Sequence, residues 1–329
     1  MALLEIENLQ VQFRTPDGVN RAVNGVSFHV DEGETLAVVG ESGCGKSVTA
    51  MSVLRLVPEP PAKLAGAIRF RGRDLFALTD REMRGIRGND ISMIFQEPMT
   101  SLNPVLTVGR QIRETLRLHQ GLNKTAANAR AVEMLALVGI SDPRRRARQF
   151  PHQLSGGMRQ RVMIAIALAC NPKLLIADEP TTALDVTIQA QILDLMRDLK
   201  RRVGAAIVLI THDLGVVAEV AQRVMVMYAG YKVEEAPVAE LFAAPRHPYT
   251  RGLLGAVPKL GSSLKGGDVK LAEIPGQVPD SSQRVEGCAF ASRCGLATDL
   301  CRTSAPSLEL KAPHHFAACH FAPQAMAAI

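Results

Sequence analysis

Residues 40–47 read Gly40-Glu41-Ser42-Gly43-Cys44-Gly45-Lys46-Ser47, between a short apolar run, Leu36 to Val39, and a helix-forming stretch, Lys46 to Leu56. Glycines in such a segment let backbone N–H groups wrap phosphate groups. Lys46 supplies positive charge to the phosphates, and the Ser47 hydroxyl can ligate Mg²⁺. A strand, a glycine loop and a helix in this order therefore predict a site for ATP or a similar nucleoside triphosphate.

A second apolar run, Leu174 to Ala177, ends in two acidic residues, Asp178 and Glu179. A buried strand can carry charge only at its exposed end. Asp178 is a candidate for holding Mg²⁺ through its water shell, and Glu179 is a candidate base for the attacking water. Gln96 follows another predicted strand, Ile91 to Phe95, and could touch both Mg²⁺ and that water. Paired acids at a strand end can also cap the next helix.

The segment Leu154-Ser155-Gly156-Gly157-Met158 lies between these two elements. Ser155, Gly156 and Gly157 stand at the start of a predicted helix, where a hydroxyl and backbone N–H groups can contact a phosphate. Serine and glycine also make common helix caps. The chain thus carries two candidate phosphate-contacting segments, one at 40–47 and one at 155–157.

The composition is that of a globular protein: 329 residues, 47% hydrophobic and 21% charged, with a net charge of +6. That charge does not choose among phosphate ligands, an anionic membrane surface and nucleic acid. No apolar run approaches the roughly 18 residues that span a bilayer. The first residues, Met1 to Glu7, lack the pattern of a secretory signal, so we expect a cytosolic location.

The order of the predicted elements indicates an α/β fold. The first 40 residues alternate apolar and polar positions, which is typical of an antiparallel hairpin. Strands and helices then alternate, which predicts a parallel sheet with covered faces. The predicted helices are 108–119, 125–138, 159–170 and 188–202, and a further strand, 206–210, leads into Thr211-His212-Asp213. Prolines and cysteines become frequent after about Ala244, so we place a domain boundary near residue 245.

Four of the six cysteines, Cys288, Cys294, Cys301 and Cys319, lie in the last 42 residues. In a reducing compartment such a group indicates metal ligation before disulfides. Four soft ligands suit a [4Fe–4S] cluster or Zn²⁺. No pair has the short spacing that structural zinc prefers, which favours the iron–sulfur cluster. A mixed zinc site with a nearby histidine, and four unligated thiols, remain open.

Taken together, the phosphate loop, the Ser-Gly-Gly segment and the acidic strand end resemble an ABC-type ATPase. Phe95-Gln96-Glu97-Pro98 resembles the family's Q-loop, and Ala183-Leu184-Asp185 resembles its D-loop, although Asp185 could equally cap a helix. His212 matches the family's switch histidine, which would stabilise charge on the γ-phosphate. Phe13 stands where the family stacks an aromatic ring on adenine, although it could instead be a hairpin core residue. Met158, which follows the Ser-Gly-Gly segment, stands at a position where the family most often has glutamine.

Three further segments resemble the ATP-binding subunits of bacterial dipeptide and oligopeptide importers: 98–104, Tyr228-Ala229-Gly230 and 246–250 (Arg246-His247-Pro248-Tyr249-Thr250). The resemblance implies a P-loop ABC-type nucleotide-binding domain over residues 1–245. That domain would have a mixed or parallel sheet core, an N-terminal antiparallel β subdomain and a helical insert at about 97–162. A small cysteine-rich extension would follow at 246–329 and hold the metal site.

The resemblance also implies a function and partners. The chain would hydrolyse ATP to energise peptide import, as a peripheral subunit on the cytoplasmic face of the bacterial inner membrane. It would pair with a homologous second ATPase subunit, in a heterodimer, and dock under two membrane-spanning permeases that an extracytoplasmic solute-binding protein supplies. Nickel or a sugar could be the cargo instead. A DNA-handling ABC ATPase is the remaining alternative, and the absence of a long insert between Gly40 and Glu179 argues against it and against a nucleic-acid partner.

Overall fold

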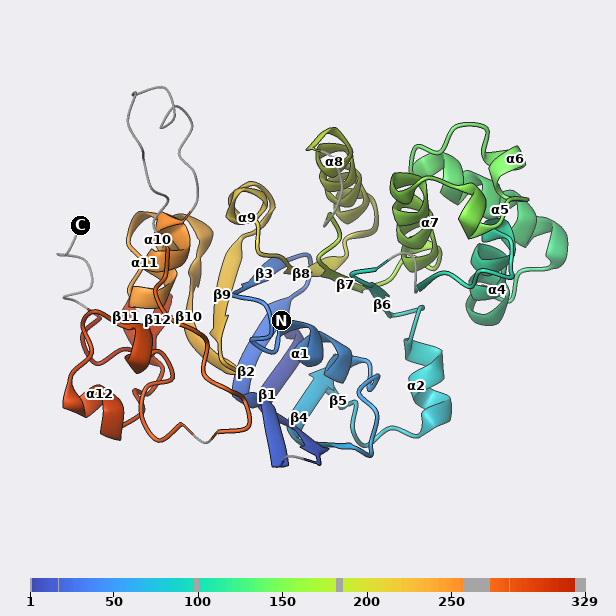
Figure 1. The fold of residues 1–329 in the computed structure, drawn as a ribbon. Helices are drawn as coiled ribbons and strands as arrows, with labels where there is room; N and C mark the ends of the chain where they lie inside the picture. Colours follow the sequence, from blue (N-terminus) through green and yellow to red (C-terminus); the bar gives the residue numbers. More distant parts are fainter. Residues whose placement is uncertain are drawn as a thin grey trace, which may run out of the picture. The chain divides into compact units, whose positions relative to one another are not determined.

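The computed structural model describes residues 2–16, 18–97, 101–181, 186–256, 273–283 and 285–322. The chain folds into two compact units, whose helices and strands are labelled in Figure 1. The first unit comprises Met1–Leu4, Val30–Thr35 and Phe70–Ile210. The second comprises Glu5–His29, Leu36–Arg69 and Thr211–Ile329. Each unit therefore combines segments that are far apart in the sequence.

The core of the first unit is a parallel sheet with β7 in the middle. Its strands are β6 (Ile91–Ile94), β7 (Leu174–Asp178) and β8 (Ala206–Ile210). Every residue of these three strands is buried. Strands of a parallel sheet that is covered on both faces are apolar throughout, which explains the uninterrupted apolar runs in the sequence. A two-residue strand, β5 (Arg73–Asp74), also lies in this unit.

The helices of the first unit lie mostly between β6 and β8 in the sequence. They are α2 (Asp80–Ile86), α4 (Val108–Gln120), α5 (Lys124–Leu137), α6 (Pro143–Arg146), α7 (Gly156–Leu168) and α8 (Val186–Val203), with a 3₁₀ turn, η1 (Pro151–Gln153). Helices α4, α5 and α7 pack against one another, and Figure 1 shows them as one green group. Ile112 and Leu116 of α4 are fully buried, as is Leu135 of α5. These helices correspond to the helical insert that the sequence predicts.

The second unit begins with long neighbouring strands, β1 (Ala2–Thr15) and β2 (Gly18–Asp31), followed by β4 (Ala62–Phe70) on the other side of β1. Alternate residues of β2 are buried from Val26 to Val30, as expected for a strand with one covered face. Helix α1 (Lys46–Val53) also lies in this unit. The two N-terminal strands confirm the hairpin pattern of the sequence.

A second sheet of this unit joins N-terminal and C-terminal segments in the order β3-β9-β10-β12-β11. The strands are β3 (Thr35–Val39), β9 (Arg223–Tyr228), β10 (Tyr231–Pro237), β11 (Glu309–Ala312) and β12 (His315–Ala317). β3 pairs with β9 in parallel, and the remaining pairs are antiparallel. The C-terminal segment is thus part of a sheet that contains the strand before the phosphate loop.

Short helices complete the second unit. They are α9 (Leu214–Val220), α10 (Val238–Ala243), α11 (Pro248–Gly255) and α12 (Asp299–Thr303), with a 3₁₀ turn, η3 (Ala291–Arg293). Tyr228, Tyr249 and Phe290 are buried in one hydrophobic cluster that β3, β9 and β10 also line. Residues before and after position 245 therefore share a core. The predicted boundary at 245 stays a prediction.

The predicted elements in the described ranges are confirmed, with small shifts at their ends. The largest shifts are three residues: α7 begins at Gly156 rather than at 159, and α1 ends at Val53 rather than at Leu56. Strands β4, β9, β10, β11 and β12 were not predicted from the sequence. Within the described part of the chain, none of the helices combines the length and apolar character that a membrane crossing needs.

Candidate nucleotide-binding site

The phosphate loop runs from the end of β3 to the start of α1, and glycine is required at two of its positions. Gly40 has φ 153° and Gly45 has φ 96°. A Cβ atom at Gly40 would lie 2.2 Å from the Met227 carbonyl oxygen, and one at Gly45 would lie 2.3 Å from the Ala22 carbonyl oxygen. Both distances are too short for any side chain, so the backbone path from 40 to 45 depends on these glycines.

Lys46 and Ser47 open α1, where unpaired backbone N–H groups and the helix dipole favour anions. The Lys46 ammonium is buried and donates to the Gly40 carbonyl oxygen at 2.8 Å and to the Glu41 carbonyl oxygen at 2.9 Å. Burial raises the pKa of the neighbouring Cys44 thiol, and the Lys46 charge opposes this shift. Ser42 and Gly43 are exposed at the tip of the loop. The loop is therefore shaped for phosphate and carries its own cation.

Gln96 and Glu179 meet at the ends of neighbouring strands in the first unit. The Gln96 side-chain amide donates to Glu179 Oε2 at 2.9 Å. Glu179 has φ 46°, a left-handed conformation that is uncommon outside glycine, and its backbone N–H donates to the Ile210 carbonyl oxygen at 2.9 Å. Asp178, the last residue of β7, is buried. The structure thus brings together two of the three predicted catalytic side chains, Gln96 and Glu179, and Asp178 directly precedes Glu179 in the sequence.

Ser155 caps helix α7: its hydroxyl accepts a hydrogen bond from the Met158 backbone N–H at 3.4 Å. The helix-cap interpretation of this segment is therefore confirmed, and the phosphate-contact interpretation stays a prediction. Ser155 and Gly156 are exposed. No described atom lies within 4 Å of a Cβ placed on Gly156, and one placed on Gly157 would make ordinary contact with Ile188 at 3.5 Å.

The remaining predicted residues are less closely defined. His212 is exposed, in the turn before α9 that Asp213 caps, and Phe13 is half-buried on β1. Half-burial fits either stacking on adenine or a place in the hairpin core. Asp185 lies outside the described residues, as do Ala183, Leu184 and the segment 98–100. The phosphate loop and His212 belong to the second unit, and Gln96, Asp178, Glu179 and Ser155 belong to the first.

Residues 23–182 match the family model described as "ABC transporter". Over 96% of its length the chain is 57% identical to the probable peptide ABC transporter ATP-binding protein y4tR of Sinorhizobium fredii, of which it covers 94%. The chain belongs to the ABC transporter ATP-binding proteins. Proteins of this family hydrolyse ATP, so the chain is an ATPase. The predicted family and the predicted P-loop ABC ATPase fold are confirmed, whereas the predicted cysteine-rich C-terminal extension is not supported.

Two further comparisons extend this assignment. Residues 233–301 match the model described as "Oligopeptide/dipeptide transporter, C-terminal region". The oligopeptide transport ATP-binding protein OppD of Bacillus subtilis is 57% identical over 90% of this chain and 82% of its own length. Among solved structures, the dimeric ATP-binding cassette MJ0796 with ADP and Pi has a TM-score of 0.65 and 29% identity, over 71% of this chain and 98% of that one.

The four C-terminal cysteines of this ATPase line a single small cavity, together with His247, Phe290 and His320. The cavity has a volume of about 20 Å³, which is about the room that one water molecule needs. Burial raises the pKa of the Cys288 and Cys294 thiols, and raises that of Cys319 to about 11. Among the described residues, no group of three or more His, Cys, Asp or Glu side chains is arranged to hold a metal ion. The predicted iron–sulfur or zinc site is therefore not supported.

Sequence reasoning assigned no role to two residues that contact the phosphate loop. The Tyr249 hydroxyl accepts from the Glu41 backbone N–H, and the Arg293 guanidinium forms an ion pair with the Glu41 carboxylate. Tyr249 belongs to the segment 246–250, which we noted only for its family resemblance. Arg293 directly precedes Cys294 in the sequence. Neither sequence position indicates contact with residue 41.

Proposed function

We propose that this ATPase energises the import of dipeptides or oligopeptides through a membrane transporter. The proposal rests on one observation: a single chain joins the ABC transporter match at 23–182 to the match with the C-terminal region of oligopeptide/dipeptide transporters at 233–301. The names of two Bacillus subtilis relatives, the OppD protein and the dipeptide transport ATP-binding protein DppD, support the same cargo.

The residues of the phosphate loop, from Gly40 to Ser47, would bind the ATP phosphates through backbone N–H groups and the Lys46 ammonium. The Ser47 hydroxyl, the Gln96 amide oxygen and the Asp178 carboxylate are oxygen donors of the kind that Mg²⁺ takes. The magnesium ion would neutralise charge that develops on the transferred phosphoryl group. Phe13 would stack on the adenine.

Glu179 is the proposed general base. Its carboxylate accepts from the Gln96 amide at 2.9 Å, which orients the carboxylate, and a carboxylate in this position would accept a proton from the attacking water. The left-handed backbone at Glu179 supports this role, because strained conformations concentrate at functional sites. His212 would donate to the γ-phosphate as charge builds up there.

The segment Ser155 to Gly157, and Asp185, would serve the ATP that a homologous second ATPase subunit holds. The exposure of Ser155 and Gly156 supports a ligand outside this chain. The complete assembly would contain two such subunits and two permeases, fed by an extracytoplasmic solute-binding protein. It would place this chain at the cytoplasmic face of the inner membrane.

Uptake measurements in a strain that lacks this chain test the proposed cargo. Complementation with the wild-type chain should restore uptake of labelled di- and tripeptides, and Lys46→Ala should not, because the loop loses its cation. Uptake of nickel and of labelled sugars should be the same in all three strains. Loss of nickel or sugar uptake with unchanged peptide uptake would contradict the peptide assignment and leave the ATPase assignment intact.

A second proposal concerns the four cysteines. We propose that they hold a [4Fe–4S] cluster or, as the alternative, Zn²⁺. The only observation in favour is that all four thiols line one cavity, since the described residues show no group arranged to hold a metal ion. The cavity would have to widen to admit a cluster. Metal analysis and the visible spectrum of protein purified without oxygen distinguish the cases: iron with brown colour, zinc without colour, or neither, which would refute the proposal.

A further inference from the structure

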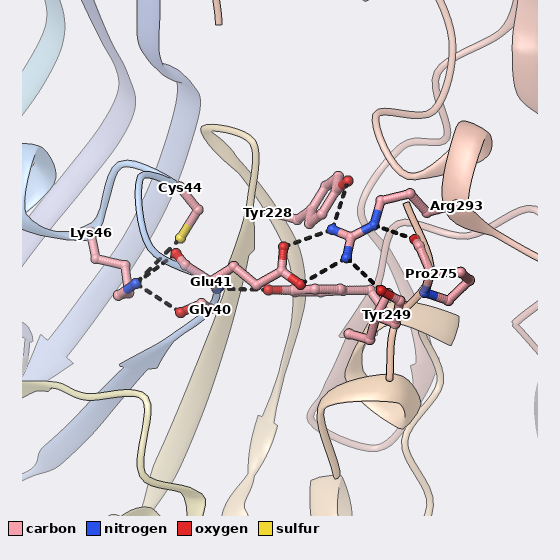
Figure 2. A network of polar contacts seen from close by, with 9 residues as sticks. Gly40, Glu41, Cys44, Lys46, Tyr228, Tyr249, Pro275 and Arg293 are labelled. Atoms are coloured by element: carbon pink, nitrogen blue, oxygen red, sulfur yellow. Dashed lines mark hydrogen bonds and ion pairs between the residues drawn. The ribbon is translucent and has the colours of Figure 1, made fainter. Parts of the chain in front are cut away.

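Glu41, the second residue of the phosphate loop, is held by two C-terminal side chains at once. Its backbone N–H donates to the Tyr249 hydroxyl at 2.8 Å. Its carboxylate accepts from both terminal nitrogens of Arg293, at 2.7 Å for Nη1–Oε2 and 3.0 Å for Nη2–Oε1. Figure 2 shows Glu41 between the loop on one side and Arg293 on the other. Main chain and side chain of one loop residue are thus fixed independently.

Arg293 is itself immobilised. Its side chain is only 5% exposed. Its Nε donates to the Pro275 carbonyl oxygen at 2.8 Å and its Nη2 to the Ile274 carbonyl oxygen at 3.1 Å. Its guanidinium carbon lies 5.8 Å from the centroid of the Tyr228 ring, within the range of a cation–π contact. A planar fork with this many fixed acceptors holds the carboxylate in one geometry, which a lysine ammonium cannot do.

Tyr249 is equally constrained. It is fully buried, and its ring centroid lies 4.7 Å from that of Tyr228 and 5.5 Å from that of Phe290. Burial raises the pKa of its hydroxyl, so the hydroxyl stays neutral and accepts from Glu41. The hydroxyl position is therefore set by aromatic packing and not by solvent.

These contacts reach the loop where its own cation is bound. The Glu41 carbonyl oxygen accepts from the Lys46 ammonium at 2.9 Å and from the Cys44 backbone N–H at 3.3 Å. A shift of Glu41 would therefore displace the lysine and the turn that present charge and N–H groups to phosphate. Figure 2 shows this continuous path from Arg293 through Glu41 to Lys46.

We propose that Arg293 and Tyr249 are positioning residues of the phosphate loop, so that the C-terminal segment is a working part of the nucleotide site. The proposal rests on ATP binding at residues 40–47. It assigns to the segment a role in nucleotide affinity that does not depend on any metal. Without the Arg293 guanidinium, the partly buried Glu41 carboxylate loses its ion pair and the phosphate loop becomes more mobile. ATP binding must then order the loop, which lowers the affinity for ATP.

Equilibrium binding of ATP to the full-length chain, measured by calorimetry, tests the proposal. Arg293→Gln should raise the Kd for ATP about tenfold, as expected when a buried charge-assisted pair is lost. Arg293→Lys should recover only part of this loss. Glu41→Gln should raise the Kd for ATP by a similar factor. The double variant, Arg293→Gln with Glu41→Gln, should bind ATP no more weakly than either single variant, because both substitutions remove the same interaction.

The matched control is Lys311→Gln, which removes the Lys311–Glu309 ion pair of 2.8 Å in β11. Its Kd should equal that of the wild type. If Arg293→Gln does not fold, Tyr249→Phe keeps the ring packing and removes only the acceptor, and should raise Kd about threefold. A folded Arg293→Gln variant with wild-type Kd, or additive losses in the double variant, would overturn the proposal. A wild-type chain that does not bind ATP would instead refute the nucleotide site itself.

Discussion

The phosphate loop and the Ser155 to Gly157 segment are both glycine-containing turns at helix starts, yet the fold requires glycine only in the first. In the loop, a Cβ at Gly40 or Gly45 would collide with backbone oxygens at 2.2 and 2.3 Å. At Gly156, no described atom lies within 4 Å of a Cβ. Neither Gly156 nor Gly157 has the positive φ that favours glycine.

This difference separates two reasons for a glycine. The loop glycines are explained by contacts inside one unit, and those contacts shape the site for this chain's own ATP. The glycines at 156 and 157 have no such explanation in the described residues, although alanine would favour a helix more at both positions. We infer that their small size serves a ligand outside the fold, as the proposed phosphate of a second subunit would require.

The largest expected effect is at the loop. Gly40→Ala should lower ATP affinity by roughly a thousandfold or more, because the turn cannot form without moving the β9 backbone at Met227. Calorimetry on the purified chain would measure this, with the melting temperature as the check on folding. Near-normal ATP binding by Gly40→Ala would contradict the statement that the fold requires glycine in the phosphate loop.

The second effect is a pH dependence on the loop side. Burial lowers the pKa of His247 to about 4, and its Nδ1 accepts from the Tyr249 backbone N–H at 3.1 Å, which requires the unprotonated nitrogen. In the unfolded chain the His247 imidazole becomes protonated near pH 6.5, and in the folded chain only near pH 4. Stability is therefore complete above about 6.5 and falls as pH drops, by about 2 kcal/mol between pH 7 and 5.

Denaturant titrations at several pH values would measure this dependence for the wild type and for His247→Asn. The difference between the two proteins isolates the contribution of His247 from that of Glu234 and His315, which share its hydrogen-bonded network. Equal slopes in the two proteins would show that His247 is not the source.

The third effect concerns Gly156. Gly156→Ala should leave the melting temperature unchanged or slightly higher, while ATP hydrolysis at the second subunit's site, measured with Glu179→Gln removing hydrolysis at this chain's own site, falls about tenfold or more. Steady-state ATPase assays and thermal melts on the same preparations give both values. If activity and stability fell together, Gly156 would be needed by the fold and the comparison would fail.

The smallest effect is at the cap. Ser155→Ala removes the hydroxyl that accepts from the Met158 N–H, which should cost about 1 kcal/mol of unfolding free energy. Ser155→Asp restores a capping oxygen and should recover that stability. It should not recover hydrolysis, because a carboxylate repels phosphate. Recovery of both would reduce the role of Ser155 to capping.

The sequence predicts the elements whose signals are local. The glycine pattern of the loop, the apolar runs of β6, β7 and β8, and the acids after β7 each depend on neighbours in the chain. Residues 41 and 293 are 252 positions apart, and no periodicity or spacing indicates that they meet. The pairing of β12 with β10 was missed for the same reason.

The four cysteines show the opposite limit of sequence reasoning. Their number and clustering predict a metal site, and the fold does bring all four to one cavity. Ligation also requires distances and directions that spacing in the sequence does not determine, and the described residues form no such group. The sequence thus predicted that the four cysteines lie close together, but it could not predict whether their sulfur atoms are arranged to bind a metal.

Hydrolysis in mixed assemblies tests the central claim most directly. With the catalytic glutamate of the second ATPase removed, only the ATP on this chain's loop turns over. With Glu179→Gln in this chain, only the other site does. Gly156→Ala should leave the first assembly active and abolish hydrolysis in the second, because its segment is proposed to contact the ATP that the second subunit holds. Loss of activity in the first assembly with normal activity in the second would contradict the account.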